Sequence, residues 1–203
     1  MSAVGGRGRF IVFEGIDGSG KSEQARRLAK WLETRRHSVV STREPTDGPW
    51  GRTYRAWARG EFEAGPDEVL HWFVSDRREH VALVIRPALE RGDVVVCDRY
   101  RDSTRAYQAA QGLDRARLRD LFSGGEFPEP DLVLWLRVPI ATALARMGKS
   151  AEERFERADF LLRVDAEYER LGLTPLDGTG SADEVERAVR ARVERVLGDA
   201  VVP

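Results

Sequence analysis

Short apolar runs recur along the chain and are separated by longer segments of mixed polar and apolar residues. The runs are Phe10–Phe13, Ser38–Thr42, Val94–Cys97, Leu132–Leu136 and, more weakly, Leu173–Leu176. Nearly continuous hydrophobicity over so short a stretch is typical of a parallel strand that is covered on both faces. The runs therefore predict buried strands of a parallel sheet.

The segments between these runs carry the 3.6-residue spacing of amphipathic helices. In the first of them, apolar residues fall at i, i+3, i+4 and i+7, namely Ala25, Leu28, Ala29 and Leu32. A longer apolar face extends from Leu70 to Ile85 and predicts a helix that bends near Pro87. Later helices are predicted at Asp114–Phe122, Ile140–Met147, Phe155–Leu171 and Ala182–Leu197. Strands that alternate with helices indicate an α/β doubly wound fold.

Length and charge narrow the range of functions. The 203 residues suit one domain with a substantial core, and no internal repeat or low-complexity tract divides them. We therefore expect a single domain over residues 1–203, with residues 1–8 disordered. The formal net charge of -1 provides no overall basic field, so nucleic acid is not an expected partner.

The cysteine content and the distribution of apolar residues indicate the cellular setting. The one cysteine, Cys97, excludes an intramolecular disulfide and favours a reducing compartment. No stretch has the length and apolarity of a signal peptide or a membrane span. We therefore predict a cytoplasmic protein without a membrane partner. Cys97 is predicted to be a small buried strand residue, because no histidine in the sequence is placed to activate it as a nucleophile.

The most specific motif joins the first predicted strand to the first predicted helix. It comprises Gly15, Ile16, Asp17, Gly18, Ser19, Gly20, Lys21 and Ser22, and it matches G-x-x-x-x-G-K-[ST]. Strand and helix lie on the correct sides, which disfavours an ordinary Gly-rich turn. Backbone N–H groups of such a loop surround phosphates, Lys21 reaches the β- and γ-phosphates of ATP, and the Ser22 hydroxyl binds Mg²⁺. Lys21 is expected to be exposed in the loop and to make no core contact.

Charged residues near the ends of other strands suit a second substrate, because ligands of open parallel sheets collect beyond the carboxyl ends of the strands. Arg43 either grips an acceptor phosphate or forms a surface pair with Glu44. Asp98 directly follows a strand, where P-loop enzymes keep a carboxylate linked to magnesium, and Arg99 beside it could clamp a phosphate. Asp17 would be repelled by phosphates and is expected to face the second substrate, unless it is a solvated turn residue.

A nucleobase could bind beside Phe73 and Arg77. The two residues are four positions apart and therefore share one helix face. An aromatic ring next to a planar cation suits stacking on a base and hydrogen bonding to it. The alternative for Phe73 is an ordinary core position, which is common for a phenylalanine on an apolar helix face.

Together these motifs resemble the thymidylate kinase (dTMP kinase) family of P-loop nucleoside monophosphate kinases. The resemblance runs from about Arg9 to Leu197. The matching segments are residues 13–22, 42–45, 98–100, 103, 106–108, 130–132, 153–156 and 177–179, together with Phe73 and Arg77. The order and spacing of these segments carry the resemblance more than any single one of them does.

The resemblance implies a fold, a reaction and an assembly. It implies a five-stranded parallel sheet flanked by helices, a homodimer, and transfer of the γ-phosphoryl group of ATP to dTMP for dTTP synthesis. Mg²⁺ would accompany ATP, with Ser22 and Asp98 as the metal-binding residues. The segment 177–179 would lie on the adenine side of ATP.

The resemblance also assigns residues to the dTMP site. They are Asp17, Arg43, Phe73, Arg77, Arg99, Ser103, Tyr107 and Gln108. Arg43 and Arg99 would hold the phosphate, and Asp17 would contact the 3′-hydroxyl side of the deoxyribose. Phe73 would stack on thymine, with Arg77 and Gln108 near the base. Tyr107 would crowd the sugar 2′ position and so disfavour ribonucleotides.

A polar segment from Arg146 to Arg157 is rich in cations and is either a lid over phosphates or a solvated connection. Some members of the family place an arginine where this chain has Gly18, so the cation for the transferred group is expected from this segment. Arg154 is the first choice because it lies in a matching segment, with Lys149, Arg146 and Arg157 behind it. The predicted catalytic residues are Asp17, Lys21, Arg99 and Arg154.

Three other functions compete with a dTMP kinase. A kinase for another deoxynucleoside monophosphate would share all these motifs. A GTPase reads guanine with an Asn-Lys-x-Asp motif, which a chain without asparagine cannot contain. A catalytically silent nucleotide-binding module is disfavoured because the charged and hydroxyl groups of the motifs are intact.

Overall fold

The structure is a computed structural model that describes residues 7–147 and 158–198. Its strands are β1 (Arg9–Glu14), β2 (Val39–Arg43), β3 (Val94–Asp98), β4 (Leu132–Arg137) and β5 (Pro175–Asp177). Its helices are α1 (Lys21–Thr34), α2 (Pro49–Ala58), α3 (Pro66–His80), the π-helical turn η1 (Val81–Ile85), α4 (Arg86–Glu90), α5 (Arg101–Ala110), α6 (Arg115–Leu121), α7 (Ile140–Met147), α8 (Ala158–Arg170) and α9 (Ala182–Leu197).

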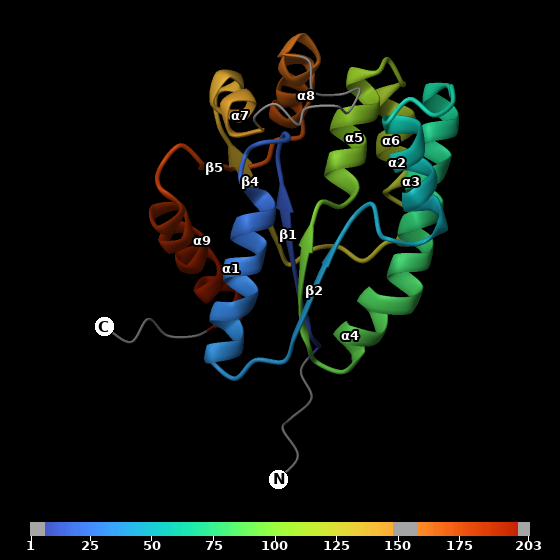
Figure 1. The fold of residues 1–203 in the computed structure, drawn as a ribbon. Coiled ribbons are helices and arrows are strands. Elements are labelled where there is room, and N and C mark those ends of the chain that lie inside the picture. Colours follow the sequence, from blue (N-terminus) through green and yellow to red (C-terminus); the bar gives the residue numbers. More distant parts are fainter. Residues whose placement is uncertain (1–6, 148–157, 199–203) are drawn as a thin grey trace.

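The five described strands form one parallel sheet in the order β2-β3-β1-β4-β5 (Figure 1). The predicted α/β fold with a five-stranded parallel sheet is confirmed. From β1 the chain moves out to β2, returns to β3, and then crosses to β4 on the other side of β1. The strand order therefore changes direction beside β1, and ligands of doubly wound sheets bind at such a point, outside the carboxyl ends of the strands.

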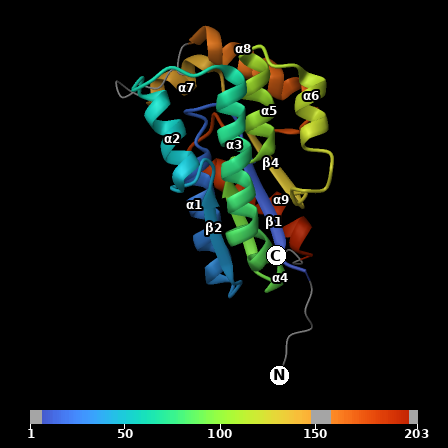
Figure 2. The same cartoon turned by 90° about the vertical axis from the view of Figure 1, so that its right-hand side faces the viewer.

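Alternating residues of β1 face the two sides of the sheet, which helices cover (Figures 1 and 2). Ile11 and Phe13 pack in one buried cluster with apolar residues of α1 and α9. Phe10 and Val12 pack in another cluster with residues of α3, η1 and α4. Helices on both faces explain why the strands read as continuous apolar runs.

A third buried cluster lies beyond the carboxyl ends of the strands, where α2, α5, α7 and α8 gather in Figure 1. Trp57 and Trp72 pack there, as do Trp135 and Tyr168, whose stacked rings are 5.9 Å apart. This cluster includes Ile16 of the loop that follows β1. No helix in the described ranges is long and apolar enough to cross a membrane.

Several boundaries differ from the sequence prediction. The long helix does not simply bend near Pro87, because the π-helical turn η1 separates α3 from α4 directly before the Arg86-Pro87 pair. A proline has no N–H group to continue the α-helical pattern, which accounts for the irregular turn at this place. The fifth strand is shorter and later than predicted. Residues 1–8 were predicted to be disordered, but Gly8 is held by a hydrogen bond from its N–H to the Leu89 carbonyl oxygen at 2.9 Å.

Two helices, α2 and α5, were not predicted. Pro49 occupies the first turn of α2, a position that proline favours because no N–H is needed there. Trp50, Tyr54 and Trp57 then recur at helical spacing, a signal that sequence reading could have used. Both helices carry residues that line the cavity described below.

Candidate functional site

The glycine-rich loop joins β1 to α1 and turns sharply at three positions. Gly15, Gly18 and Gly20 have φ angles of 137°, 78° and 94°, values that favour glycine. Lys21 is the first residue of α1 and only 5% exposed, so the expected exposed loop position is wrong. Its ammonium donates to the Ile16 carbonyl oxygen at 2.7 Å. Burial, together with the charge of Arg99, lowers the pKa of Lys21 to about 8.

Helix α7 lies directly over the loop at Gly18. A β-carbon at this position would come within 2.3 Å of the Ala143 carbonyl oxygen. An arginine at this position would therefore require α7 to move. The nearest described cation from α7 is Arg146, whose Nη2 donates to the Gly178 carbonyl oxygen at 2.9 Å. The sequence predicts Arg154 ahead of Arg146 for this role, but Arg154, Lys149 and Arg157 lie outside the described residues.

Ser22 and Asp98 meet where the first turn of α1 approaches the end of β3. The Ser22 hydroxyl donates to Asp98 Oδ2 at 2.5 Å. Asp98 Oδ1 is buried and has no hydrogen-bond partner among the described residues. The described ranges contain no group of three or more His, Cys, Asp or Glu side chains able to hold a metal. This pair of oxygen donors fits Mg²⁺, which binds few protein ligands and completes its shell with phosphates and water.

Arg99 follows β3 and projects toward the loop with a left-handed backbone, φ 71°. Its Nη2 donates to the Asp17 carboxylate, and its Nη1 donates to the Ser103 hydroxyl at 3.1 Å. The Asp17 N–H donates to the Tyr107 hydroxyl at 3.2 Å. Burial would raise the pKa of Asp17, but the charges of Arg99 and Lys21 outweigh it and lower that pKa below its ordinary value.

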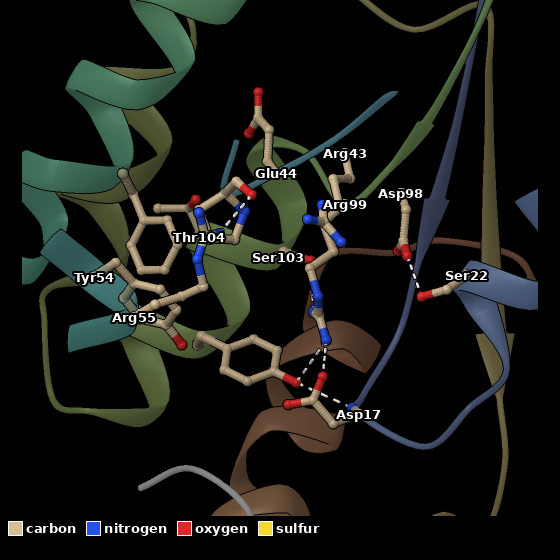
Figure 3. Close-up of a pocket in the computed structure, with 13 residues that line it drawn as sticks. Asp17, Ser22, Arg43, Glu44, Tyr54, Arg55, Asp98, Arg99, Ser103 and Thr104 are labelled. Carbon is tan, nitrogen blue, oxygen red and sulfur yellow. Dashed lines mark hydrogen bonds and ion pairs between the residues drawn. The ribbon is translucent and has the colours of Figure 1, made fainter. Parts of the chain in front are cut away.

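These groups surround a cavity of about 360 Å³ (Figure 3). It is lined by Asp17, Ser22, Arg43, Glu44, Pro45, Tyr54, Arg55, Phe73, Asp98, Arg99, Ser103, Thr104 and Tyr107. Strand register brings two of the contributors together, because Arg43 and Asp98 are paired residues of β2 and β3. The structure thus gathers most of the predicted second-substrate residues around one space.

Arg43 and Phe73 both line the cavity, and their contacts can be compared with the alternatives of a surface ion pair for Arg43 and a core position for Phe73. Arg43 pairs with Asp47 at 2.9 Å, whereas the alternative paired it with Glu44. The Phe73 ring is half-buried and packs at 4.7 Å, centre to centre, on the ring of Tyr54, so it is neither a plain core residue nor a free surface ring.

Arg77 and Gln108 do not line the cavity. Arg77 is 1% exposed, and its Nε and Nη2 donate to the Glu44 carboxylate at 2.8 and 2.6 Å. Nη2 also donates to the Thr104 hydroxyl at 2.9 Å. Arg77 therefore lies behind Glu44 and Thr104, which do face the cavity. Gln108 is fully buried, and neither of its amide atoms has a partner among the described residues.

Sequence reading missed Tyr54, Arg55, Glu44 and Thr104 as lining residues. Arg55 is held in place by the loop after β2, since its Nη2 donates to the Thr46 carbonyl oxygen at 2.8 Å. The helical spacing of aromatic residues in α2 was the available signal for the first two. Glu44 lies in the matching segment 42–45 but was given no role at the cavity. Nothing in the sequence indicated Thr104, because its place at the cavity depends on packing against Arg77 of α3.

A second cavity of about 330 Å³ lies on the other side of the phosphate loop, lined by Ser19, Gly20, Glu23, Gln24, Arg146, Gly178, Gly180, Ser181, Ala182 and Val185. Asp177 orders its rim by accepting from the Thr179 N–H and hydroxyl at 2.8 and 2.7 Å. The loop expected beside adenine therefore borders a separate space that adjoins the phosphate loop.

Comparison with known proteins agrees with this geometry. The sequence model of the family described as thymidylate kinase matches residues 13–189. A thymidylate kinase of Desulfotalea psychrophila is 36% identical over 94% of this chain and 96% of its own length. One from Akkermansia muciniphila is 43% identical over 82% and 88%, and one from Xanthomonas campestris pv. campestris is 42% identical over 95% and 86%. The chain belongs to the thymidylate kinase family.

Proposed function

We propose that the protein transfers the γ-phosphoryl group of ATP to the 5′-phosphate of dTMP, giving dTDP and ADP. The observation that carries the proposal is the cavity at the ends of β1, β2 and β3. It reaches from the glycine-rich loop, through Arg99, to the aromatic pair of Tyr54 and Phe73. A nucleoside monophosphate placed along this line presents its phosphate to the loop and its base to the aromatic rings.

Charge neutralisation and positioning would carry the reaction, as in other phosphoryl transfers. Lys21 would bind the β- and γ-phosphates from the first turn of α1. Arg99 lies at the boundary between the two substrates, and its guanidinium would pair with the acceptor phosphate, aided by Arg43. The acceptor oxygen is already anionic, so no general base is required. Asp17 would hold Arg99 and meet the sugar.

Ser22 and Asp98 would hold Mg²⁺ in this scheme, the carboxylate directly or through water. When bound, the metal supplies positive charge to the phosphates of ATP. Asp98 Oδ1, buried and unpartnered among the described residues, provides a free acceptor oxygen for that task. Arg146 and the 177–179 loop would flank the adenosine part of ATP at the second cavity.

The base end of the cavity supports a pyrimidine acceptor. Phe73 offers a ring for stacking, and Thr104 presents a hydroxyl that Arg77 holds from behind. The Tyr107 ring, beneath Arg99 at 5.1 Å, would restrict the sugar at its 2′ position. Another deoxynucleoside monophosphate is the competing acceptor. A homodimer is part of the proposal and is tested by light scattering on the purified chain.

The decisive experiment is a coupled ADP-release assay with ATP, Mg²⁺ and a panel of acceptors. We expect dTMP to give the highest kcat/KM, followed by dUMP, with UMP, dCMP and dGMP far behind. A higher kcat/KM for any other monophosphate would reassign the acceptor. ADP release that does not depend on any monophosphate would overturn the kinase proposal.

A further inference from the structure

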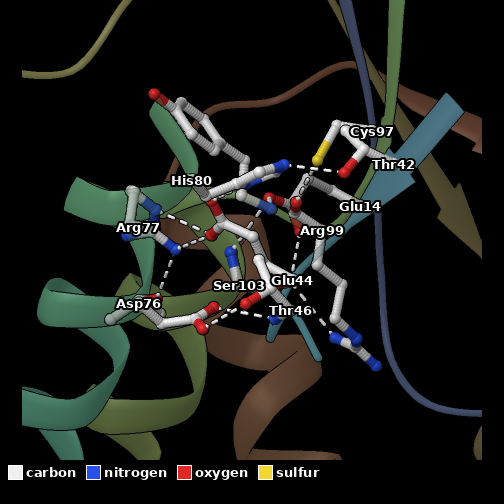
Figure 4. Close-up of polar contacts among 12 residues, drawn as sticks. Glu14, Thr42, Glu44, Thr46, Asp76, Arg77, His80, Cys97, Arg99 and Ser103 are labelled. Carbon is white, nitrogen blue, oxygen red and sulfur yellow. Dashed lines mark hydrogen bonds and ion pairs between the residues drawn. The ribbon is translucent and has the colours of Figure 1, made fainter. Parts of the chain in front are cut away.

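Glu14, the last residue of β1, is a fully buried carboxylate and is not among the residues that line the cavity. Figure 4 shows it among the polar contacts that include Arg99 and Ser103. Its Oε1 accepts the backbone N–H groups of Tyr100 and Ser103 at 3.0 and 3.1 Å. Its Oε2 accepts the Tyr168 hydroxyl at 2.9 Å and the Ser103 hydroxyl. A buried carboxylate with four donated hydrogen bonds fixes every group that donates to it.

The contacts of Glu14 enclose the backbone of Arg99. That residue adopts the left-handed conformation, which is unfavourable for a non-glycine residue and persists only where the surroundings enforce it. The Arg99 N–H donates to the Phe13 carbonyl oxygen at 2.9 Å, and the Cys97 thiol donates to the Arg99 carbonyl oxygen at 3.0 Å. The next N–H, that of Tyr100, ends on Glu14. The peptide groups on both sides of Arg99 are therefore anchored.

Glu14 also sets the orientation of the Ser103 hydroxyl. In its ionised form, which prevails above about pH 7, Glu14 only accepts hydrogen bonds, so the hydroxyl proton points to Glu14 and a lone pair of the oxygen faces Arg99. Arg99 Nη1 donates to that oxygen at 3.1 Å. The side chain of Arg99 thus rests on a hydroxyl whose direction Glu14 determines.

We propose that Glu14 is a positioning residue for phosphoryl transfer, which aims Arg99 into the cavity through the Tyr100 N–H and the Ser103 hydroxyl without touching a substrate. The inference rests on the role of Arg99 in the proposed function. The competing interpretation is that Glu14 only caps the start of α5, in which case it supports folding and not the reaction.

Glu14→Gln separates the two interpretations. The amide keeps the size of the side chain, but only one of its two terminal atoms can accept, so either the N–H pair or the hydroxyl pair loses its acceptor. We expect kcat to fall by about tenfold or more, since small displacements of a catalytic group can cost 10²-fold. The KM for ATP should stay within twofold of wild type. Glu14→Asp keeps the carboxylate, so its kcat should lie between that of wild type and that of Glu14→Gln.

A double-mutant cycle tests whether the effect passes through Arg99. In an Arg99→Ala background, Glu14→Gln should change kcat by less than twofold, because no guanidinium remains to be aimed. An equal fold-loss in both backgrounds would overturn the proposal. So would a lowered melting temperature with unchanged kcat. If Glu14→Gln does not fold, the same cycle is run with Glu14→Asp, which decides by the same criterion.

Glu167→Gln is the matched control. Glu167 is also a buried carboxylate, 6% exposed, but it pairs with Arg115 of α6 and makes no contact with Arg99 or Glu14 among the hydrogen bonds of the described residues. Glu167→Gln should lower the melting temperature with little change in kcat. Wild-type turnover of dTMP, measured first, shows whether the proposed function holds. A failure confined to the Glu14 variants therefore concerns this inference alone.

Discussion

Lys21 combines a buried position with a positive charge, and the combination suits a polyanionic ligand. Its ammonium has one short contact, to the Ile16 carbonyl oxygen, and its pKa is lowered to about 8 by burial first and Arg99 second. Phosphates that bind beside it would raise that pKa again, because opposite charge favours the ionised form. ATP affinity should therefore weaken as the pH rises above about 8.

Lys21→Met tests the charge while keeping most of the buried stem. We expect kcat to fall by about 10²-fold or more, on the scale of removing one preorganised charge donor, with the fold retained. Steady-state rates and a melting curve measure both effects. Lys30→Met, an exposed position on the same helix, is the control and should change neither. Activity of Lys21→Met within tenfold of wild type would contradict the role of Lys21.

Phe73→Ala tests the base end of the cavity. Loss of a stacked ring should cost about 1–3 kcal/mol of binding free energy for dTMP and so raise the KM for dTMP roughly 5- to 150-fold. The KM for ATP should change little. Phe62→Ala removes a ring that is 39% exposed and lies outside the cavity, and it should leave both KM values alone. If Phe73→Ala lowers the melting temperature and moves neither KM, the ring serves packing only.

At the scale of elements, α7 and the glycine-rich loop are fitted to each other through backbone atoms. Gly18→Ala would push a β-carbon toward the Ala143 carbonyl oxygen, in addition to straining φ. Gly112, with φ 100° and nothing within 4 Å of a β-carbon, isolates the strain alone. We expect Gly18→Ala to destabilise the protein by at least about 1 kcal/mol more than Gly112→Ala, measured by denaturant unfolding. Equal losses would show that α7 yields freely.

The cations of α7 and of the segment after it should have different roles, one in binding ATP and the other in transferring its γ-phosphoryl group. Arg146 borders the second cavity, so Arg146→Ala should raise the KM for ATP several-fold and leave that for dTMP unchanged. Arg154 is predicted from sequence to serve the transferred group, so Arg154→Ala should lower kcat by about 10²-fold with modest change in either KM. Near-normal kcat after replacing each of Arg146, Lys149, Arg154 and Arg157 would refute a lid cation.

At the scale of the whole molecule, the buried carboxyl group of Glu14 should make the free energy of unfolding depend on pH. Burial, followed by the charge of Asp102, raises the pKa of Glu14 from 4.5 to about 7, against the opposing influence of Ser103, Arg99 and Tyr168. The folded state then binds this proton more tightly than the unfolded state. The resulting stabilisation is fully present below pH 4.5 and is lost as the pH rises to about 7.

Wild type and Glu14→Gln should therefore differ in their pH profiles. Between pH 4.5 and 7, the free energy of unfolding of wild type should fall relative to that of Glu14→Gln by on the order of 3 kcal/mol. Denaturant unfolding at a series of pH values measures the difference. Parallel profiles for the two proteins would mean that Glu14 keeps an ordinary pKa in the folded state.

Sequence reading performed best where one residue's surroundings follow from local pattern. Apolar runs such as Phe10–Phe13 became strands, and the glycine-rich loop lies between β1 and α1 as expected. It did less well where a contact joins distant segments. Phe73 and Arg77 share a helix face, yet Arg77 pairs with Glu44 and does not line the cavity. No local sequence pattern indicates that pairing. Lys21 was misplaced for the same reason, since the groups that bury it come from several elements.

The contact between Gly18 and Ala143 also bears on how such a site can change over time. A side chain at position 18 and the present position of α7 exclude one another, because a β-carbon there would lie 2.3 Å from the Ala143 carbonyl oxygen. A single change of Gly18 to arginine would therefore require α7 to move as well. An engineered exchange of Gly18 for arginine would therefore have to replace the loop and α7 together.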